Sequence, residues 1–142
     1  MNRRRREKLS ARLVSAALLG ESARVRALLR SGAPAETADA DGTTPLYQAA
    51  VQGDAETVRL LLAAGASPDT ESGTGSEGLP PCGAACWGYT EAVRALLDHG
   101  ADPRRREDHG TGLTALEWAD KGPHPETAAL LRAALRAPHG AG

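Results

Sequence analysis

The sequence predicts an all-α fold, a solenoid of four stacked helix-turn-helix repeats with short finger turns. Two small residues followed by a glycine, as at 49–50 before Gly53, occur three times, at spacings of 33 and then 35 residues. Each copy continues with paired leucines and a second glycine, as at 61–62 before Gly65. A unit of this length forms two short helices that cannot bury their apolar faces alone, so it must stack on copies of itself.

Each element of the second copy has a local cause. Thr44 can accept backbone N–H groups as an N-cap, and Pro45 fits the first helical position, where a missing N–H costs nothing. The small residues at 49–50 let two helices approach closely along the buried stripe. Gly53 and Gly65 are expected to end the two helices in the left-handed conformation, which glycine adopts without strain.

The third copy departs from this pattern at its start. Residues 79–82 read Leu-Pro-Pro-Cys where the second copy reads Thr-Pro-Leu-Tyr. The N-cap hydroxyl of Thr44 is therefore lost, and Pro81 replaces the core residue Leu46. We expect this repeat to be the weakest joint of the stack.

The repeats fill most of the chain. We expect a basic N-terminal arm at residues 1–8, a repeat domain at 9–137 and a C-terminal tail at 138–142. The individual repeats are expected at residues 9–38, 39–71, 72–106 and 107–137. In the last of these, Gly122 comes early after Thr114, so we expect the first helix to be one residue short.

The second copy resembles the ankyrin repeat. It matches the motif T-P-L-x-x-A-A-x-x-G, followed by V-x-x-L-L-x-x-G-A, almost residue for residue, with Tyr47 where the family usually has histidine. The resemblance extends over roughly residues 9–136, and the first and last copies are looser, as terminal repeats usually are. It implies a partner protein bound on the concave face formed by the finger turns and the first helices.

The resemblance also implies which positions face that groove. They are the two positions before the glycine that ends each first helix, together with positions in the fingers. The helix positions are Leu18, Leu19, Val51, Gln52, Cys86, Trp87 and Lys121, and the finger positions are Asp41, Thr43, Thr111 and Leu113. Exposed apolar residues with a polar rim are typical of a binding site. In an alternative arrangement Trp87 folds back on its neighbours, and the N-terminal arm covers Leu18 and Leu19.

Other motifs carry weaker signals. The segment 73–78 reads G-x-G-x-x-G, but a dinucleotide site needs that loop between a strand and a helix, and a helix pattern precedes it here. Cys82 and Cys86 lie four apart on one predicted helix, and a zinc site would need two further ligands. No serine lies in a nucleophile elbow, and no pair of carboxylates sits in an apolar setting. We therefore expect a chain that is not an enzyme, with no metal and no cofactor.

Charge is distributed unevenly. The net charge is −1, but residues 1–33 carry +7 and residues 34–142 carry −8. The interpretation we favour is that the basic start keeps the end of the stack solvated, and the alternative is that it binds an anionic surface. Arginines without interleaved aromatic residues do not favour nucleic acid. Arginine outnumbers lysine 15 to 2, which suggests a GC-rich bacterial gene.

The N-terminus imitates a secretory signal, but we expect it to belong to the first repeat. Its apolar part, 13–19, is short, is interrupted by Ser15, and falls on the buried stripe of the first predicted helix. The apolar runs are too short to span a bilayer. Two cysteines without a disulfide framework agree with a cytoplasmic protein.

The sequence thus predicts a monomeric protein-protein interaction module that holds a partner protein in its concave groove. The partner's identity does not follow from the sequence, and we expect neither a small-molecule substrate nor a membrane. Two alternatives stay open. One is an inhibitor or immunity-type partner of one specific enzyme or effector. The other is a weak binder of anionic surfaces through the N-terminal arginines.

Overall fold

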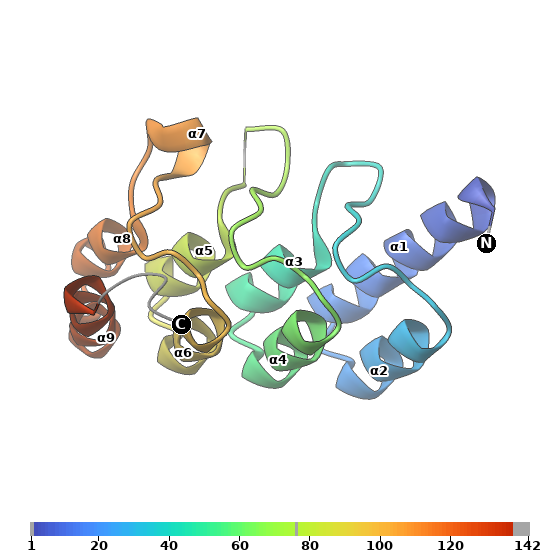
Figure 1. Cartoon of the computed structure of the whole chain (residues 1–142), viewed down its shortest axis with the longest axis horizontal. Helices are drawn as coiled ribbons and strands as arrows, with labels where there is room; N and C mark the ends of the chain where they lie inside the picture. Colours follow the sequence, from blue (N-terminus) through green and yellow to red (C-terminus); the bar gives the residue numbers. More distant parts are fainter. Residues whose placement is uncertain (1, 76, 138–142) are drawn as a thin grey trace.

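The computed structural model describes residues 2–75 and 77–137, and over these residues it contains nine helices and no strand (Figure 1). The helices are α1 (Arg3–Leu18), α2 (Ser22–Arg30), α3 (Pro45–Val51), α4 (Ala55–Ala63), α5 (Pro80–Cys86), α6 (Thr90–Asp98), α7 (Glu107–Gly110), α8 (Ala115–Lys121) and α9 (Pro125–Arg136). An isolated bridge pairs Arg106 with Thr114. The predicted all-α fold is confirmed.

Eight of these helices form four pairs that stack into two layers. The first-helix layer consists of α1, α3, α5 and α8, and the second-helix layer of α2, α4, α6 and α9, with each helix contacting its neighbour in the same layer (Figure 1). Three loops project from the first-helix layer, and we call them finger 1 (residues 36–43), finger 2 (70–75 and 77–78) and finger 3 (105–113) (Figure 1). The predicted solenoid of four stacked helix pairs is therefore confirmed.

One continuous core runs between the layers. The small pairs at 16–17, 49–50 and 84–85 have no exposed surface, as close helix packing requires. Leucines and valines of both layers fill the space around them, and each buried leucine contributes about 2 kcal/mol. The core is shared by all four pairs, so no repeat buries its apolar face without its neighbours.

Glycine ends the helices as predicted. Gly53 and Gly65 have φ angles of 70° and 105°, which confirms their left-handed caps. The aromatic ring of Tyr89 from the next repeat lies against Gly53, and a Cβ built there would come within 2.6 Å of Tyr89 Cδ1. Position 53 thus needs glycine both for its backbone conformation and for the close approach of the next repeat.

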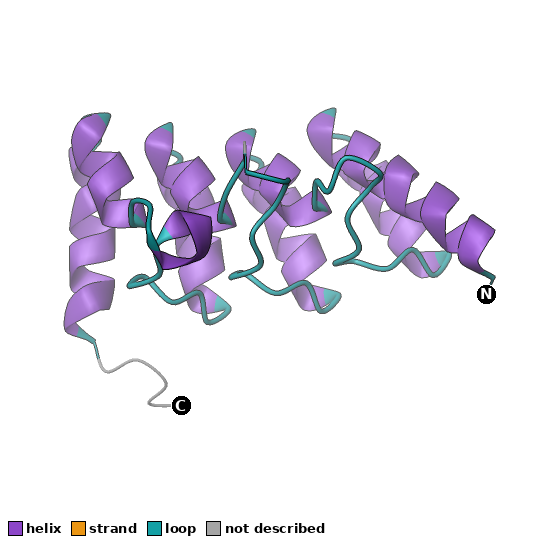
Figure 2. Ribbon diagram, turned by 90° about the horizontal axis from the view of Figure 1, so that it is seen from above, coloured by secondary structure: helices purple, strands orange, loops and turns teal. Residues whose placement is uncertain are grey.

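The first helix extends well beyond the stack. α1 has 16 residues against seven in α3, and its additional turns carry the basic segment that the sequence analysis assigned to an arm (Figure 2). The side chain of Asn2 caps this helix by accepting from Arg5 N at 2.9 Å. Residues 3–8 are exposed, whereas Leu13 has no exposed surface and lies in the core, as expected. Residue 1 and the predicted tail at 138–142 lie outside the described residues.

The fourth pair differs from its prediction in one respect. α8 has seven residues, as α3 and α5 do, so the expected shortening is wrong. The reason is that Gly122 keeps a right-handed φ of −53° and continues the helical path as the C-cap. Thr114 and Glu117 form a reciprocal capping box at the other end of the helix.

Finger 3 contains a strained turn. Within α7, Asp108 and His109 have φ angles of 51° and 53°, so this segment is a left-handed turn and not an ordinary helix. Each such residue costs about 1–2 kcal/mol. Contacts with finger 2 hold the turn in place, because His109 N donates to Glu71 Oε1 at 2.8 Å.

Candidate binding groove between the fingers and the first helices

Hydrogen bonds join fingers 1 and 2 into one wall. Gly73 N donates to the carbonyl of Gly42 at 2.7 Å. The hydroxyl of Thr43 donates to Glu77 Oε2 at 3.0 Å, and the hydroxyl of Ser72 donates to Glu77 Oε1 at 2.7 Å. Glu77 is thus held at both oxygens, and the two fingers are pre-ordered before any partner arrives.

Finger 3 is tied to the helices behind it by Glu107. Its carboxylate accepts from Leu79 N at 3.1 Å and from Trp118 Nε1 at 2.7 Å. Burial raises the pKa of Glu107, and these two hydrogen bonds partly oppose that shift. Trp118 packs against the core, so its indole ring braces the base of the finger.

Burial also sets the protonation of two groups behind the fingers. It raises the pKa of the Cys82 thiol, which is buried and donates to the carbonyl of Leu113 at 3.7 Å. It raises the pKa of Tyr47 to about 12, with a smaller contribution from Glu77. Both groups are therefore neutral at physiological pH, and Cys82 is not a thiolate nucleophile. Neither Cys82 nor Cys86 forms a disulfide.

A hollow of about 470 Å³ lies between α1 and fingers 1 and 2. Three residues predicted for the groove line it, namely Leu18, Asp41 and Thr43. Asp39 and Glu77 line it as well. We call this space the groove hollow. The residues that line the groove hollow come from α1 and from two fingers that are far apart in the sequence. The hydrogen bonds between fingers 1 and 2 fix the relative positions of the finger residues.

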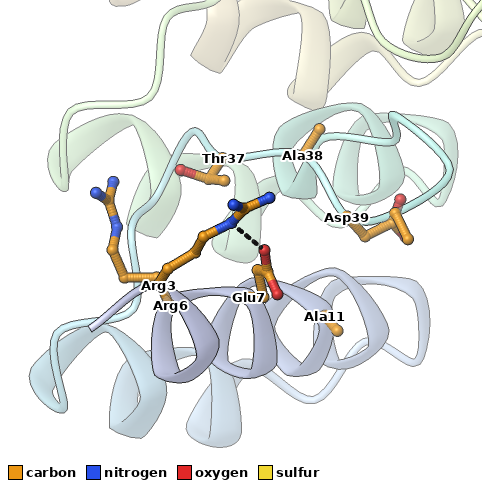
Figure 3. Close-up of a pocket in the computed structure, with 8 residues that line it drawn as sticks. Arg3, Arg6, Glu7, Ala11, Thr37, Ala38 and Asp39 are labelled. Atoms are coloured by element: carbon orange, nitrogen blue, oxygen red, sulfur yellow. Dashed lines mark hydrogen bonds and ion pairs between the residues drawn. The ribbon is translucent and has the colours of Figure 1, made fainter. Parts of the chain in front are cut away.

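A second hollow, of about 650 Å³, lies beside it between finger 1 and the N-terminal turns of α1 (Figure 3). Arg3 and Arg6 line this space together with Glu7 and Asp39. Arg3 Nε donates to Glu7 Oε1 at 3.0 Å, an exposed ion pair that contributes little to stability. Asp39 lines both hollows, but basic and acidic side chains balance in this second one, whereas the charged side chains that line the groove hollow are acidic.

Comparison with known families agrees with this architecture. A model for ankyrin repeats in three copies matches residues 5–72, and a model for a single ankyrin repeat matches residues 81–108. The chain belongs to the ankyrin repeat family. A search of curated proteins finds no match. The two family matches end before the last ankyrin pair, and α8 and α9 are assigned to it from their stacking on α5 and α6.

The ankyrin first helices expose several predicted groove residues. Leu18 is 45% exposed, Leu19 64% and Trp87 63%, so none of these three side chains is buried beneath neighbouring residues. Gln52, Lys121, Asp41 and Thr111 are also exposed. These residues are free of the core and accessible from the solvent.

Other predicted residues are used within the fold. Thr43 is only 6% exposed, because its hydroxyl is turned to Glu77. Val51 is half-buried and lies so close to α5 that a Cβ at Gly83 would be 2.7 Å from its Cγ1. Cys86 is half-buried, and its carbonyl accepts from His124 Nε2 at 3.0 Å. Leu113 is half-buried at the base of finger 3.

The sequence analysis missed Asp39, Gln48 and Glu77, which also line the groove hollow. The sequence analysis recognised the glycines at 73, 75 and 78, and the structure places these glycines between α4 and α5. The significance of Glu77 beside these glycines depends on a contact with Thr43, 34 residues earlier. No local pattern signals such a contact.

Among the helices of 2–75 and 77–137, none has both the length and the hydropathy that crossing a bilayer requires. In the same residues, no three histidine, cysteine, aspartate or glutamate side chains come together in a group that would hold a metal ion.

Proposed function

We propose that this ankyrin repeat protein binds a partner protein on its groove face, the surface formed by the three fingers and the first-helix layer. The observation that carries the proposal is the placement of exposed apolar residues. The large hydrophobic side chains exposed in the described part of the chain are Leu18, Leu19, Trp87 and Tyr89, and each lies at or just beyond the end of a first helix.

This placement is typical of a binding surface. Apolar side chains gathered at one edge of a fold mark sites of protein association, and tryptophan is enriched among the residues that dominate binding energy. The fingers are already held by hydrogen bonds such as Gly73 N to Gly42 O, so little conformational entropy is lost when the partner docks. Binding by shape and side-chain complementarity needs no cofactor and no reaction step.

The experiment is affinity capture with three versions of the full chain. A partner taken up by the wild type should be lost with Trp87→Ala and kept with Arg59→Ala, which alters an exposed residue of the second-helix layer. Loss of a central tryptophan is expected to cost at least about 2 kcal/mol of binding energy. Circular dichroism checks that both variants remain helical. Equal capture by Trp87→Ala and the wild type would remove Trp87 from the site.

Capture also separates the two kinds of binding protein. A general adaptor should retain several proteins that depend on Trp87, whereas a dedicated inhibitor should retain one tight target. A target that is an enzyme and loses activity when the purified chain is added would establish inhibition. We favour the adaptor, because the groove face combines separate apolar and charged regions and not one deep cavity.

A further inference from the structure

The groove hollow has a chemical character that defines its occupant. We propose that it receives a segment of the partner protein in which a lysine or arginine lies next to an apolar side chain. This inference rests on the proposed function, since it specifies the chemistry of a partner held on the groove face. It concerns only the space between α1 and fingers 1 and 2, which does not include Trp87.

The floor of the groove hollow is largely apolar. α1 contributes Ala11, Val14 and Leu18 to its lining, together with the polar Ser15. Leu18 is 45% exposed although it is a large aliphatic side chain at the end of a helix. An apolar side chain of the partner that covers Leu18 removes this surface from water, which is the main favourable term in association.

The rim of the groove hollow is acidic. Asp39 and Asp41 of finger 1 and Glu77 of finger 2 line it, and no lysine, arginine or histidine among the residues that the structure describes does so. In the described part of the chain, none of these three carboxylates takes part in an ion pair with a basic side chain. No ion pair within these ranges neutralises the carboxylates, although Asp39 also lines the hollow that contains Arg3 and Arg6. A cation of the partner is therefore attracted to the rim.

The geometry of the rim is already fixed. Asp39 Oδ1 accepts from Asp41 N at 2.9 Å and from Thr43 N at 3.1 Å, while Glu77 accepts from the hydroxyls of Thr43 and Ser72. These donors are neutral, so they orient the carboxylates without cancelling their charge. Lysine and arginine have only donors, and they match an acceptor-only rim.

The charge also excludes other occupants. A nucleic acid or an acidic peptide would bring negative charge against the rim, and like charges at close range cost binding energy. Basic side chains line the neighbouring hollow instead, where Arg3 and Arg6 lie together with Glu7 and Asp39 (Figure 3). A basic and apolar protein segment is thus the occupant that fits both floor and rim.

The test uses three synthetic peptides as probes, with Leu-Arg-Leu, Leu-Glu-Leu and Ser-Arg-Ser at their centres and otherwise identical flanks. Binding to the full chain is followed by amide chemical shifts in NMR titrations, which detect weak association. The Leu-Arg-Leu peptide should bind best and should shift the amides of Asp41, Gln48 and Glu77. Its affinity should fall as salt is added, because screening weakens the contact with the rim.

Variants of the chain make the test specific. Asp41→Asn removes one charge from an exposed side chain that makes no hydrogen bond within the described residues, and it should weaken Leu-Arg-Leu binding roughly ten-fold. Leu18→Ser should weaken the same peptide by removing the apolar floor. Asp98→Asn, a matched change on the second-helix layer, should leave the affinity unchanged.

The outcomes separate this inference from the proposed function. Absence of binding, equal binding of the three peptides, preference for Leu-Glu-Leu, or an unchanged affinity of Asp41→Asn would each overturn the inference. Trp87→Ala should still bind the Leu-Arg-Leu peptide, because Trp87 lies outside the groove hollow. Peptide binding without Trp87-dependent capture would overturn only the proposed function, and capture without peptide binding would overturn only the inference.

Discussion

The second and third repeats build the same helix from different starting residues. α3 and α5 both have seven residues and begin with proline. The hydroxyl of Thr44 caps α3 by accepting from Tyr47 N at 3.2 Å, whereas Leu79 gives α5 no side-chain cap. The predicted loss of the cap in the third repeat is therefore confirmed, yet α5 is as long as α3.

The backbone N–H of the N-cap residue explains how the two helices stay alike. In both repeats this group donates to a side chain 28 residues further on, in the finger of the next repeat. Thr44 N donates to Ser72 Oγ at 2.9 Å, and Leu79 N donates to Glu107 Oε2 at 3.1 Å. The start of each first helix thus depends on the following repeat, which couples neighbouring repeats during folding.

The largest expected effect comes from breaking the stronger of these two links. Glu107→Ala leaves both Leu79 N and Trp118 Nε1 without their acceptor, and we expect it to lower the free energy of unfolding by about 2–3 kcal/mol. Ser72→Ala, the matched change at the link from the second repeat, removes the acceptor of Thr44 N and the hydroxyl that donates to Glu77. It should cost only about 1 kcal/mol, because Glu77 is only half-buried and keeps its bond from Thr43. Urea denaturation of the two variants measures the difference.

A surface variant provides the control for this pair. Glu126→Ala removes an exposed carboxylate from α9 and should change the stability by no more than about 0.5 kcal/mol. If Glu107→Ala and Ser72→Ala cost the same, the additional bond of Glu107 to Trp118 does not strengthen the link of the third repeat. The two repeats would then be equally dependent on their neighbours.

The sequence predicted what lies within a repeat, and it did not predict what lies between repeats. The left-handed glycines at 53 and 65 and the Thr44 cap follow from local geometry, and the structure confirms them. The roles of Glu77 and Glu107 depend on partners 28 or more residues away. The helical start of α1 also escaped the analysis, because residues 3–8 have no apolar periodicity.

The same distinction applies to the candidate site. The family register placed Leu18 and Trp87 at the ends of first helices, and the structure shows them exposed there. It also placed Thr43 on the groove face, but that residue is buried because finger 2 supplies Glu77 as its acceptor. The adjacent finger decides whether a finger residue is exposed. The sequence of the residue's own loop is therefore not enough to predict its exposure.

A second prediction concerns the apolar start of α5. Pro81 is buried at the position that Leu46 occupies in α3. Pro81→Leu should add buried aliphatic surface and raise the free energy of unfolding by about 1 kcal/mol. The converse change, Leu46→Pro, should lower it, because it removes a fully packed leucine from the second repeat.

Thermal denaturation followed by circular dichroism checks both changes. An unchanged or lower melting temperature for Pro81→Leu would mean that the space around α5 is already filled. The third repeat would then not be the weak joint that the comparison with the second repeat predicts. Leu46→Pro is the reference for Pro81→Leu, because it makes the opposite change at the same position of the second repeat. Its effect measures how much a leucine at this position contributes to stability.

The smallest expected effect is a dependence of stability on pH that arises from Glu107, the acceptor of the N-cap N–H of α5. Burial raises the pKa of Glu107 above its ordinary value of 4.5, so the folded state holds this proton more tightly than the unfolded state does. The resulting stabilisation is fully present below the ordinary pKa, and it is lost as the pH rises through the raised pKa of the folded state. Glu107→Gln keeps an acceptor but cannot titrate.

The stability of the wild type relative to Glu107→Gln should therefore increase as the pH falls from neutral toward the ordinary glutamate pKa. Urea denaturation of both proteins over this range measures the difference, and the titration of all other groups cancels. The increase should be small, because water reaches part of the half-buried carboxylate. If the difference in unfolding free energy between the wild type and Glu107→Gln instead stays constant or shrinks as the pH falls, the prediction is wrong. That result would show that the hydrogen bonds of Glu107 to Leu79 and Trp118 outweigh the effect of burial on its pKa.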